Sequence, residues 1–124
     1  MMNKLNIKGI HIHDNTYHRD RDRWDVPTLI AYCKAKEYPV FKYPIEAINL
    51  DAYPFDVNNI HDFIYNSIRV QETNLQYPIL VDDKGIICDG WHRVIKAILE
   101  GRDYVDAIRI LEMPSPSGKE ETNG

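Results

Sequence analysis

The hydrophobic and polar positions along the chain switch between the period of a helix and the period of a strand. Apolar residues recur at helical spacing after Pro27, with Asp25 as a candidate N-cap, and predict a first helix that stops at Pro39. The alternation in Tyr43–Leu50 then predicts a strand. A second helix is predicted over Val57–Val70, because its apolar residues fall on one helical face.

The third quarter of the chain predicts a hairpin, a helix and a last strand. Two short apolar strands, Pro78–Val81 and Ile86–Cys88, flank a polar turn in which Gly85 is expected to take a positive φ. Helical spacing over Trp91–Glu100 predicts a third helix, and Tyr104–Ile110 a final strand. This order of elements predicts a mixed α/β fold, with a small mixed sheet and packed helices.

The chain length predicts one domain with polar segments at both ends. A chain of 124 residues is long enough to bury one core, which we assign to residues 1–113. Residues 1–25 are expected to form an extended N-terminal arm. Alternating charges in its part Asp14–Asp25 favour a solvated connection over a binding surface. The small, polar residues 114–124 are predicted to be a disordered tail.

Composition and charge are those of a globular domain with a small negative net charge. Hydrophobic residues make up 44% of the chain and charged residues 27%, which is typical of a globular domain. The chain has no apolar run of transmembrane length and no signal-peptide pattern, so a cytoplasmic location is expected. Cys33 and Cys88 are then expected to be free thiols. A net charge of −4 argues against a general electrostatic grip on nucleic acid.

A pair of histidines near the N-terminus is a candidate metal site. His11 and His13, together with Asp14 and His18, could hold zinc or manganese. We favour an exposed strand face with polar alternation instead, because no second cluster of ligands accompanies the pair. We therefore predict no metal site here, and we expect zinc to leave the stability of the protein unchanged.

The strongest candidate for chemistry is the run Asp89–Arg93, DGWHR, where a strand ends and a helix begins. The first N–H groups of a helix have no intrahelical acceptor, and the helix dipole is positive there. Gly90 lets a ligand approach the backbone, and Arg93 offers a bidentate fork to a phosphate. His92 adds a donor, and Lys96 adds positive charge one turn later. These features predict a phosphate site; the alternative is a capped turn with surface side chains.

At these residues the chain resembles the ParB/sulfiredoxin superfamily. The segment Tyr77–Ile110 is similar to the core of that family, in which a strand pair is followed by a G-x-[HR]-R motif at a helix N-terminus. The upstream segments Pro44–Leu50 and Val57–Val70 resemble the preceding strand and helix of the family. The resemblance implies a compact ParB/sulfiredoxin-like domain, most similar to small stand-alone ParB-like proteins of phages and mobile elements.

The resemblance implies a phosphate-binding site, but members of the superfamily use this site for different activities. The ParB motif holds the triphosphate of CTP, but this chain lacks the second phosphate motif and the helix-turn-helix domain of those proteins. Sulfiredoxins have their reactive cysteine where Trp91 stands. The D-G-H-H-R motif of the free-serine kinases binds nucleotide phosphates, and Asp89, Gly90, His92 and Arg93 match it. Glu46 is the nearest candidate for the upstream acidic catalytic residue of those kinases.

We therefore expect a nucleoside di- or triphosphate, with or without Mg²⁺, as the ligand. The expected binding residues are Gly90, Trp91, His92, Arg93 and Lys96. Phosphoryl transfer or nucleotide hydrolysis would use Asp89 as base or metal ligand, His92 to stabilise charge, and Glu46. Two other hypotheses stay open: a non-catalytic interaction protein that engages a host or DNA-associated partner, and a ParB-like nuclease.

Overall fold

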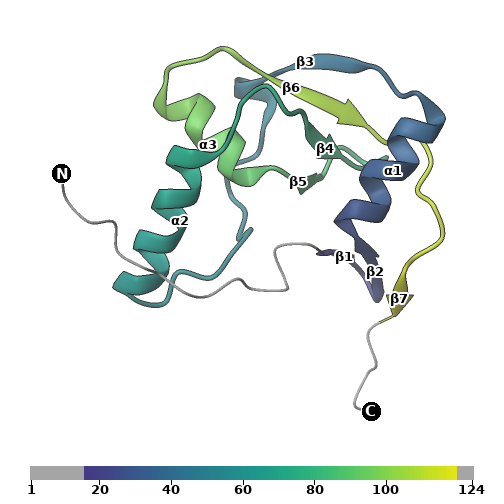
Figure 1. Ribbon diagram of the computed structural model, residues 1–124, viewed down its shortest axis with the longest axis horizontal. Coiled ribbons are helices and arrows are strands. Elements are labelled where there is room, and N and C mark those ends of the chain that lie inside the picture. Colours follow the sequence, from purple (N-terminus) through teal and green to yellow (C-terminus); the bar gives the residue numbers. More distant parts are fainter. Residues whose placement is uncertain (1–15, 120–124) are drawn as a thin grey trace.

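The computed structural model describes residues 16–119 and has an α/β fold, as expected. Figure 1 shows a helix pair, α2 and α3, at one end of the molecule and helix α1 at the other, with strands between them. In chain order the elements are β1 (Thr16–Arg19), β2 (Asp22–Asp25), α1 (Val26–Lys36), β3 (Val40–Pro44), α2 (Ile60–Glu72), β4 (Ile79–Val81), β5 (Ile87–Asp89), α3 (Trp91–Leu99), β6 (Tyr104–Arg109) and β7 (Gly118–Lys119). Among these elements no helix is both long and apolar enough to cross a membrane.

Strand β4 lies inside a four-stranded mixed sheet of order β3-β6-β4-β5. It pairs parallel with β6 and antiparallel with β5, and β3 pairs antiparallel with β6. All three residues of β4 are buried. Because successive side chains of a strand point to opposite faces, β4 contributes to a core on each side of the sheet.

Two hydrophobic cores lie on opposite faces of this sheet. Ile79 and Val81 of β4 pack on one face with the inner face of α3, which contributes the fully buried Val94 and Ala97. Leu80 packs on the other face with α1 and the β1–β2 hairpin. Both faces of the sheet are therefore covered. The chain passes from β5, an edge strand of this sheet, into α3 through a single residue, Gly90.

The charged segment before α1 is a paired hairpin, so the prediction of a solvated arm is wrong for residues 16–25. Strands β1 and β2 pair antiparallel, with Tyr17 directly opposite Trp24. Both aromatic side chains are buried, and their rings stack with centroids 5.9 Å apart. The surrounding charges concealed this pair in the sequence, although one inward residue on each strand is enough to anchor a short hairpin.

The segment after Met113 also belongs to the fold. Strand β7 pairs with β2, and the indole Nε1 of Trp24 donates a hydrogen bond of 2.8 Å to the carbonyl oxygen of Pro114. The Ser117 amide donates to the Arg23 carbonyl at 2.8 Å. The prediction of a disordered tail is therefore wrong for residues 114–119, and residues 120–124 lie outside the described residues.

A chain that stops after Met113 should be less stable than the full chain by about 2 kcal/mol, because the buried indole of Trp24 loses its acceptor. A chain that stops after Lys119 keeps Pro114, Ser117 and β7 and is the matched control. Urea unfolding of the three chains measures the difference. Equal stability of the two shortened chains would contradict a structural role for residues 114–119.

Two predicted boundaries shift for local reasons. The strand predicted over Tyr43–Leu50 is wrong in its extent, because β3 ends at Pro44 and a 3₁₀ turn, Ile45–Ala47, follows. Proline has no N–H for a sheet ladder and suits a strand end. Helix α2 begins at Ile60 rather than at residue 57, because Asn59 is its N-cap and accepts from the Asp62 amide at 2.9 Å.

Candidate functional site

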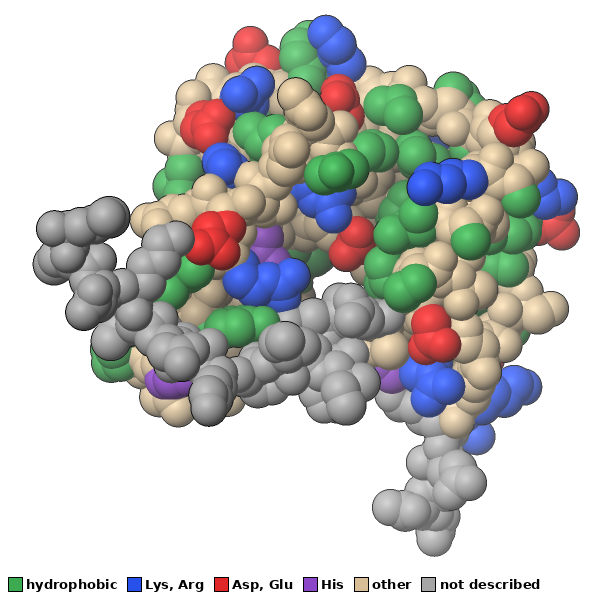
Figure 2. All heavy atoms as spheres, in the orientation of Figure 1, with side chains coloured by type: hydrophobic (Ala, Val, Ile, Leu, Met, Phe, Trp, Pro, Cys, Tyr) green, Lys and Arg blue, Asp and Glu red, His purple; other side chains and the backbone are tan. Residues whose placement is uncertain are grey.

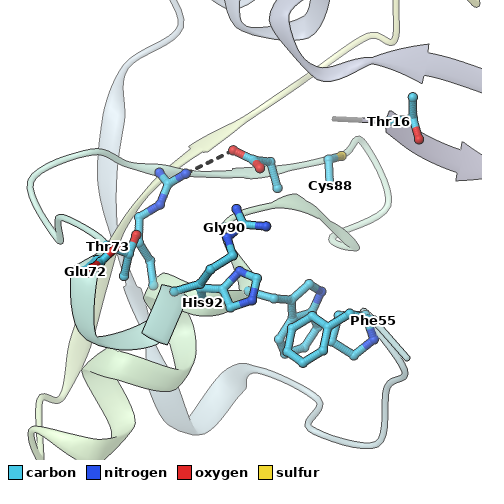
Figure 3. Close-up of a pocket in the computed structure, with 12 residues that line it drawn as sticks. Thr16, Phe55, Glu72, Thr73, Cys88, Gly90 and His92 are labelled. Carbon is cyan, nitrogen blue, oxygen red and sulfur yellow. Dashed lines mark hydrogen bonds and ion pairs between the residues drawn. The ribbon is translucent and has the colours of Figure 1, made fainter. Parts of the chain in front are cut away.

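A cavity of about 290 Å³ lies at the N-terminus of α3, beside the last turn of α2. All five residues of the predicted run, Asp89–Arg93, line it. Figure 3 shows Gly90 and His92 between two walls, with Glu72 and Thr73 on one side and Phe55 on the other. The structure thus brings the predicted run to one hollow, and segments distant in sequence complete it.

The backbone at the start of α3 has the geometry of an anion site. Gly90 is the N-cap with φ 105°, and the first helical hydrogen bond runs from the Val94 amide to the Gly90 carbonyl at 3.0 Å. The amides of residues 91–93 therefore precede the hydrogen-bond ladder, where the helix dipole is positive. A Cβ at position 90 would stand 2.6 Å from Cγ2 of Ile79, so the core, as well as the backbone angle, requires glycine.

Arg93 is held in place by three acceptors. Its Nη1 donates to the carbonyl oxygens of Tyr77 and Pro78, and its Nη2 lies 3.0 Å from Oδ2 of Asp89. The side chains of Arg93 and Asp89 are 16% and 22% exposed, so this ion pair is partly shielded from water. A guanidinium has five N–H groups, and three of them are used here. Arg93 is thus preorganised at the cavity wall with donor capacity left over.

His92 is fixed by different partners. Its Nε2 lies 2.9 Å from Oδ1 of Asn66, whose amide nitrogen donates to the Asp62 carbonyl. This arrangement makes Nε2–H the donor in the pair. The imidazole stacks on the ring of Phe55, with centroids 4.7 Å apart and an interplanar angle of 3°. His92 and Arg93 therefore line one cavity, but separate hydrogen-bond partners set their positions.

The structure does not bring Lys96 or Glu46 to this cavity. The Nζ of Lys96 donates to the carbonyl oxygens of Gln71 and Thr73, at 2.9 and 2.8 Å, and so caps the C-terminus of α2. One helical turn carries a side chain about 5.4 Å along the axis, away from the N-terminal amides. Glu46 is exposed on the 3₁₀ turn after β3 and does not line the cavity.

Sequence reasoning missed the residues that α2 and the preceding loop contribute. Arg69 and Glu72 come from the last turns of α2, and Phe55 comes from the loop before it. The helical pattern of residues 57–70 predicted the helix. Such a pattern does not indicate that the C-terminal end of α2 lies against the N-terminal end of α3. The available signal was the polar character of Arg69 and Glu72 at the end of an otherwise amphipathic helix.

The cavity carries charges of both signs. Arg69 and Arg93 are its arginines, and Glu72 and Asp89 its carboxylates. Figure 2 shows basic, acidic and histidine side chains around the hollow near the centre of the view. Cys88 also lines the cavity, but burial and the nearby Asp82 carboxylate raise the pKa of its thiol well above the usual value. A thiol with so high a pKa is a poor nucleophile at neutral pH.

A buried carboxylate ties the hairpin to the turn that precedes the site. Asp82 is fully buried and accepts hydrogen bonds from the Tyr17 hydroxyl at 2.7 Å and from Arg19 at 3.0 Å. The amides of Lys84 and Ile86 donate to its other oxygen. Burial alone would raise the pKa of Asp82, but these hydrogen bonds stabilise the charged form and hold the pKa below its usual value.

The predicted absence of a metal site at the N-terminal histidines stays a prediction. His11, His13 and Asp14 lie outside the described residues. His18 lies in β1, and its Nε2 is 3.2 Å from Oγ1 of Thr16. Within residues 16–119 no three His, Cys, Asp or Glu side chains stand close enough together to hold a metal ion. Cys33 and Cys88 are free thiols, as predicted.

Comparisons with known proteins find no matching family model, no matching curated protein and no matching solved structure. The resemblance of the segment Tyr77–Ile110 to the ParB/sulfiredoxin superfamily therefore stays a prediction from the sequence. The function must be argued from the geometry of the site.

Proposed function

We propose that this domain binds a phosphate-bearing ligand, a nucleoside di- or triphosphate, in the cavity at the N-terminus of α3. The observation that carries the proposal is that the amides of residues 91–93 precede the helical ladder beside a cavity that two arginines also line. The first amides of a helix, the helix dipole and arginine are groups that bind phosphate in proteins. The cavity volume of about 290 Å³ suits the phosphates and part of the ligand.

The carboxylates of the cavity argue for a ligand that arrives with a divalent cation. Glu72 and Asp89 would repel a bare phosphate, although Arg69 and Arg93 attract it. Carboxylate oxygens together with phosphate oxygens are the usual ligands of Mg²⁺, and Glu72 and Asp89 would supply the carboxylate oxygens. When bound, Mg²⁺ would neutralise phosphate charge.

The ion pair between Asp89 and Arg93 favours nucleotide binding over phosphoryl transfer as the function of the cavity. Asp89 is paired with Arg93, whose Nη2 donates a hydrogen bond of 3.0 Å to Oδ2 of the carboxylate. A general base for phosphoryl transfer would therefore have to be the other carboxylate oxygen, Oδ1, or the pair would have to rearrange. Hydrolysis or phosphoryl transfer is a second proposal, which goes beyond binding.

Arg69→Ala is the sharpest test of the binding proposal. Arg69 lines the cavity and lies over the ring of Tyr65, 5.9 Å from its centroid, within the same helix. Arg93 instead holds the carbonyls of Tyr77 and Pro78, which lie outside its own helix, so Arg93→Ala would perturb the fold as well. We expect Arg69→Ala to weaken nucleotide binding by about 10- to 150-fold, the loss of one charge-assisted contact. Titration calorimetry with ADP and ATP, with and without MgCl₂ and at one salt concentration, measures the effect.

The matched control is Arg102→Ala, which removes an exposed arginine whose partner is Glu100 and which does not line this cavity. It should bind nucleotide as the parent does. The absence of any calorimetric or thermal-shift response of the parent to nucleotide or inorganic phosphate would overturn the proposal.

A second function is favoured by a different surface. An apolar groove of about 490 Å³ runs along α3 and the loop before α2, and its walls include the exposed side chains of Leu50, Tyr53 and Leu99. Exposed apolar patches mark interaction sites in many proteins. This groove supports the hypothesis of an interaction protein, for which a protein or DNA-associated partner is expected. No observation in residues 16–119 favours the nuclease.

A further inference from the structure

A second cavity, of about 390 Å³, shares Asp89 and Arg93 with the first. It lies under helix α1, which contributes Ile30 and the buried Cys33 to its wall. Leu80 of β4 and residues 77–78 complete it. The cavity is of the size that binds small molecules in proteins, and most of its lining residues lie on helices and strands.

The walls of this second cavity are mostly apolar. Leu80 and Cys33 are 3% and 2% exposed and mark its inner part, and Ile30 and Tyr77 are 38% and 66% exposed and mark its mouth. An apolar molecule that filled it would remove these surfaces from water. An aromatic ring is the favoured shape for the body of the ligand, because it buries a large apolar surface and, being rigid, loses little conformational freedom on binding.

The charged groups of the second cavity favour an uncharged ligand. Lys34 is exposed in the last turn of α1, and Glu37 is exposed at the C-cap that follows the helix. Asp89 and Arg93 form an ion pair at the other wall. The two positive and two negative charges cancel. A ligand with a net charge would therefore meet a like charge and lose its hydration without gaining an excess of the opposite sign.

The ion pair retains hydrogen-bonding capacity for a polar head. Oδ2 of Asp89 accepts from Arg93, which leaves Oδ1 as an acceptor at a carboxylate that is 22% exposed. Arg93 uses three of its five N–H groups within residues 16–119. A hydroxyl both donates and accepts, so a hydroxyl on an apolar ring matches this wall best.

We propose that the second cavity binds a small, uncharged ring compound that carries a hydroxyl group, a ligand of the phenol class. The ring lies against Leu80 and Ile30, and the hydroxyl meets the Asp89–Arg93 pair. The proposal does not rest on phosphate binding in the first cavity.

Three matched probes test the proposal: 4-methylphenol, toluene and 4-methylbenzoate. Methyl NMR spectra of the full chain should show saturable shifts at Ile30, Leu80 and Ile108 with 4-methylphenol. Toluene, which lacks the hydroxyl, should bind roughly fivefold more weakly, the fold-change expected of one hydrogen bond. The charged 4-methylbenzoate should bind more weakly still. Equal affinities for all three probes, or shifts confined to other residues, would overturn the proposal.

Ile30→Trp fills the mouth of the cavity and should reduce the affinity for 4-methylphenol at least tenfold. Ile60→Trp is the matched control, because Ile60 is an exposed helical isoleucine that does not line this cavity. Lys34→Trp, at another exposed position of the mouth, replaces Ile30→Trp if that variant does not fold. An equal loss of affinity in Ile60→Trp would assign the probe to a different surface and refute the proposal.

Discussion

Asp82→Asn should lower the free energy of unfolding by about 3 kcal/mol, the usual cost of removing one partner from a buried ion pair. The reason is that Asp82 is fully buried and accepts from Tyr17, Arg19 and two backbone amides. The amide that replaces it cannot accept on both sides, so Arg19 loses its buried counter-charge. Urea unfolding at neutral pH measures the effect.

Asp83→Asn is the matched control for this prediction. Asp83 neighbours Asp82 and pairs with the same arginine, Arg19, but its side chain is 31% exposed. Water screens such a pair, so its loss should cost under about 1 kcal/mol. Equal effects of the two variants would show that burial does not set the strength of the Asp82 contacts.

The effect of Asp82→Asn should also depend on pH. Because the folded-state pKa of Asp82 lies below its unfolded value, the stabilisation is fully present above about pH 4. It is lost as the pH falls through the folded-state pKa and the carboxylate becomes protonated in both states. The unfolding free energies of the parent and Asp82→Asn should therefore converge in acid. A constant difference from neutral pH down to strong acid would contradict the role of the charge.

Gly90→Ala should destabilise the protein by about 3 kcal/mol, from two sources. The φ of 105° lies in the region that L residues avoid, which costs about 1–2 kcal/mol. The added methyl would also stand 2.6 Å from Cγ2 of Ile79, and because Ile79 is fully buried it has little room to move. Overpacking of this kind costs about 1–3 kcal/mol. Thermal and urea unfolding measure the sum.

Gly85→Ala separates the two sources. Gly85 has a φ of 87°, but a Cβ there meets nothing within 4 Å. It should therefore show the conformational cost alone, about 1 kcal/mol. If Gly85→Ala cost as much as Gly90→Ala, the contact with Ile79 would not matter. Gly90→Ala is for the same reason a poor probe of ligand binding, because it changes the fold before it changes the site.

The sequence predicted the elements around the site well because their signals are local. The start of α3 at Trp91 is the predicted one, and β5 ends at Asp89, one residue later than predicted, with glycine at the junction between the two elements. Gly85 takes the positive φ that its turn position predicts. In each case a residue type dictates its own backbone conformation.

The rest of the site could not be predicted because it depends on packing between distant segments. Arg69 reaches the cavity only because α2 packs beside α3. Nothing in the sequence of either helix indicates that the other is its packing partner. Lys96 was assigned to the ligand on charge and proximity in sequence, but the carbonyls at the end of α2 are its partners. Residues 114–119 look disordered by composition, yet the buried indole of Trp24 and the pairing with β2 bind that segment.

The contact between Trp24 and Pro114 joins residues 90 positions apart, and Asp25 joins Ser117 across 92. A ribosome adds about 5–20 residues per second, so Trp24 is synthesised roughly 5–18 seconds before its acceptor exists. During that interval the β1–β2 hairpin lacks its third strand and a partner for its indole. Closing the small sheet is therefore a late event of folding, because it must follow the synthesis of residues 114–119.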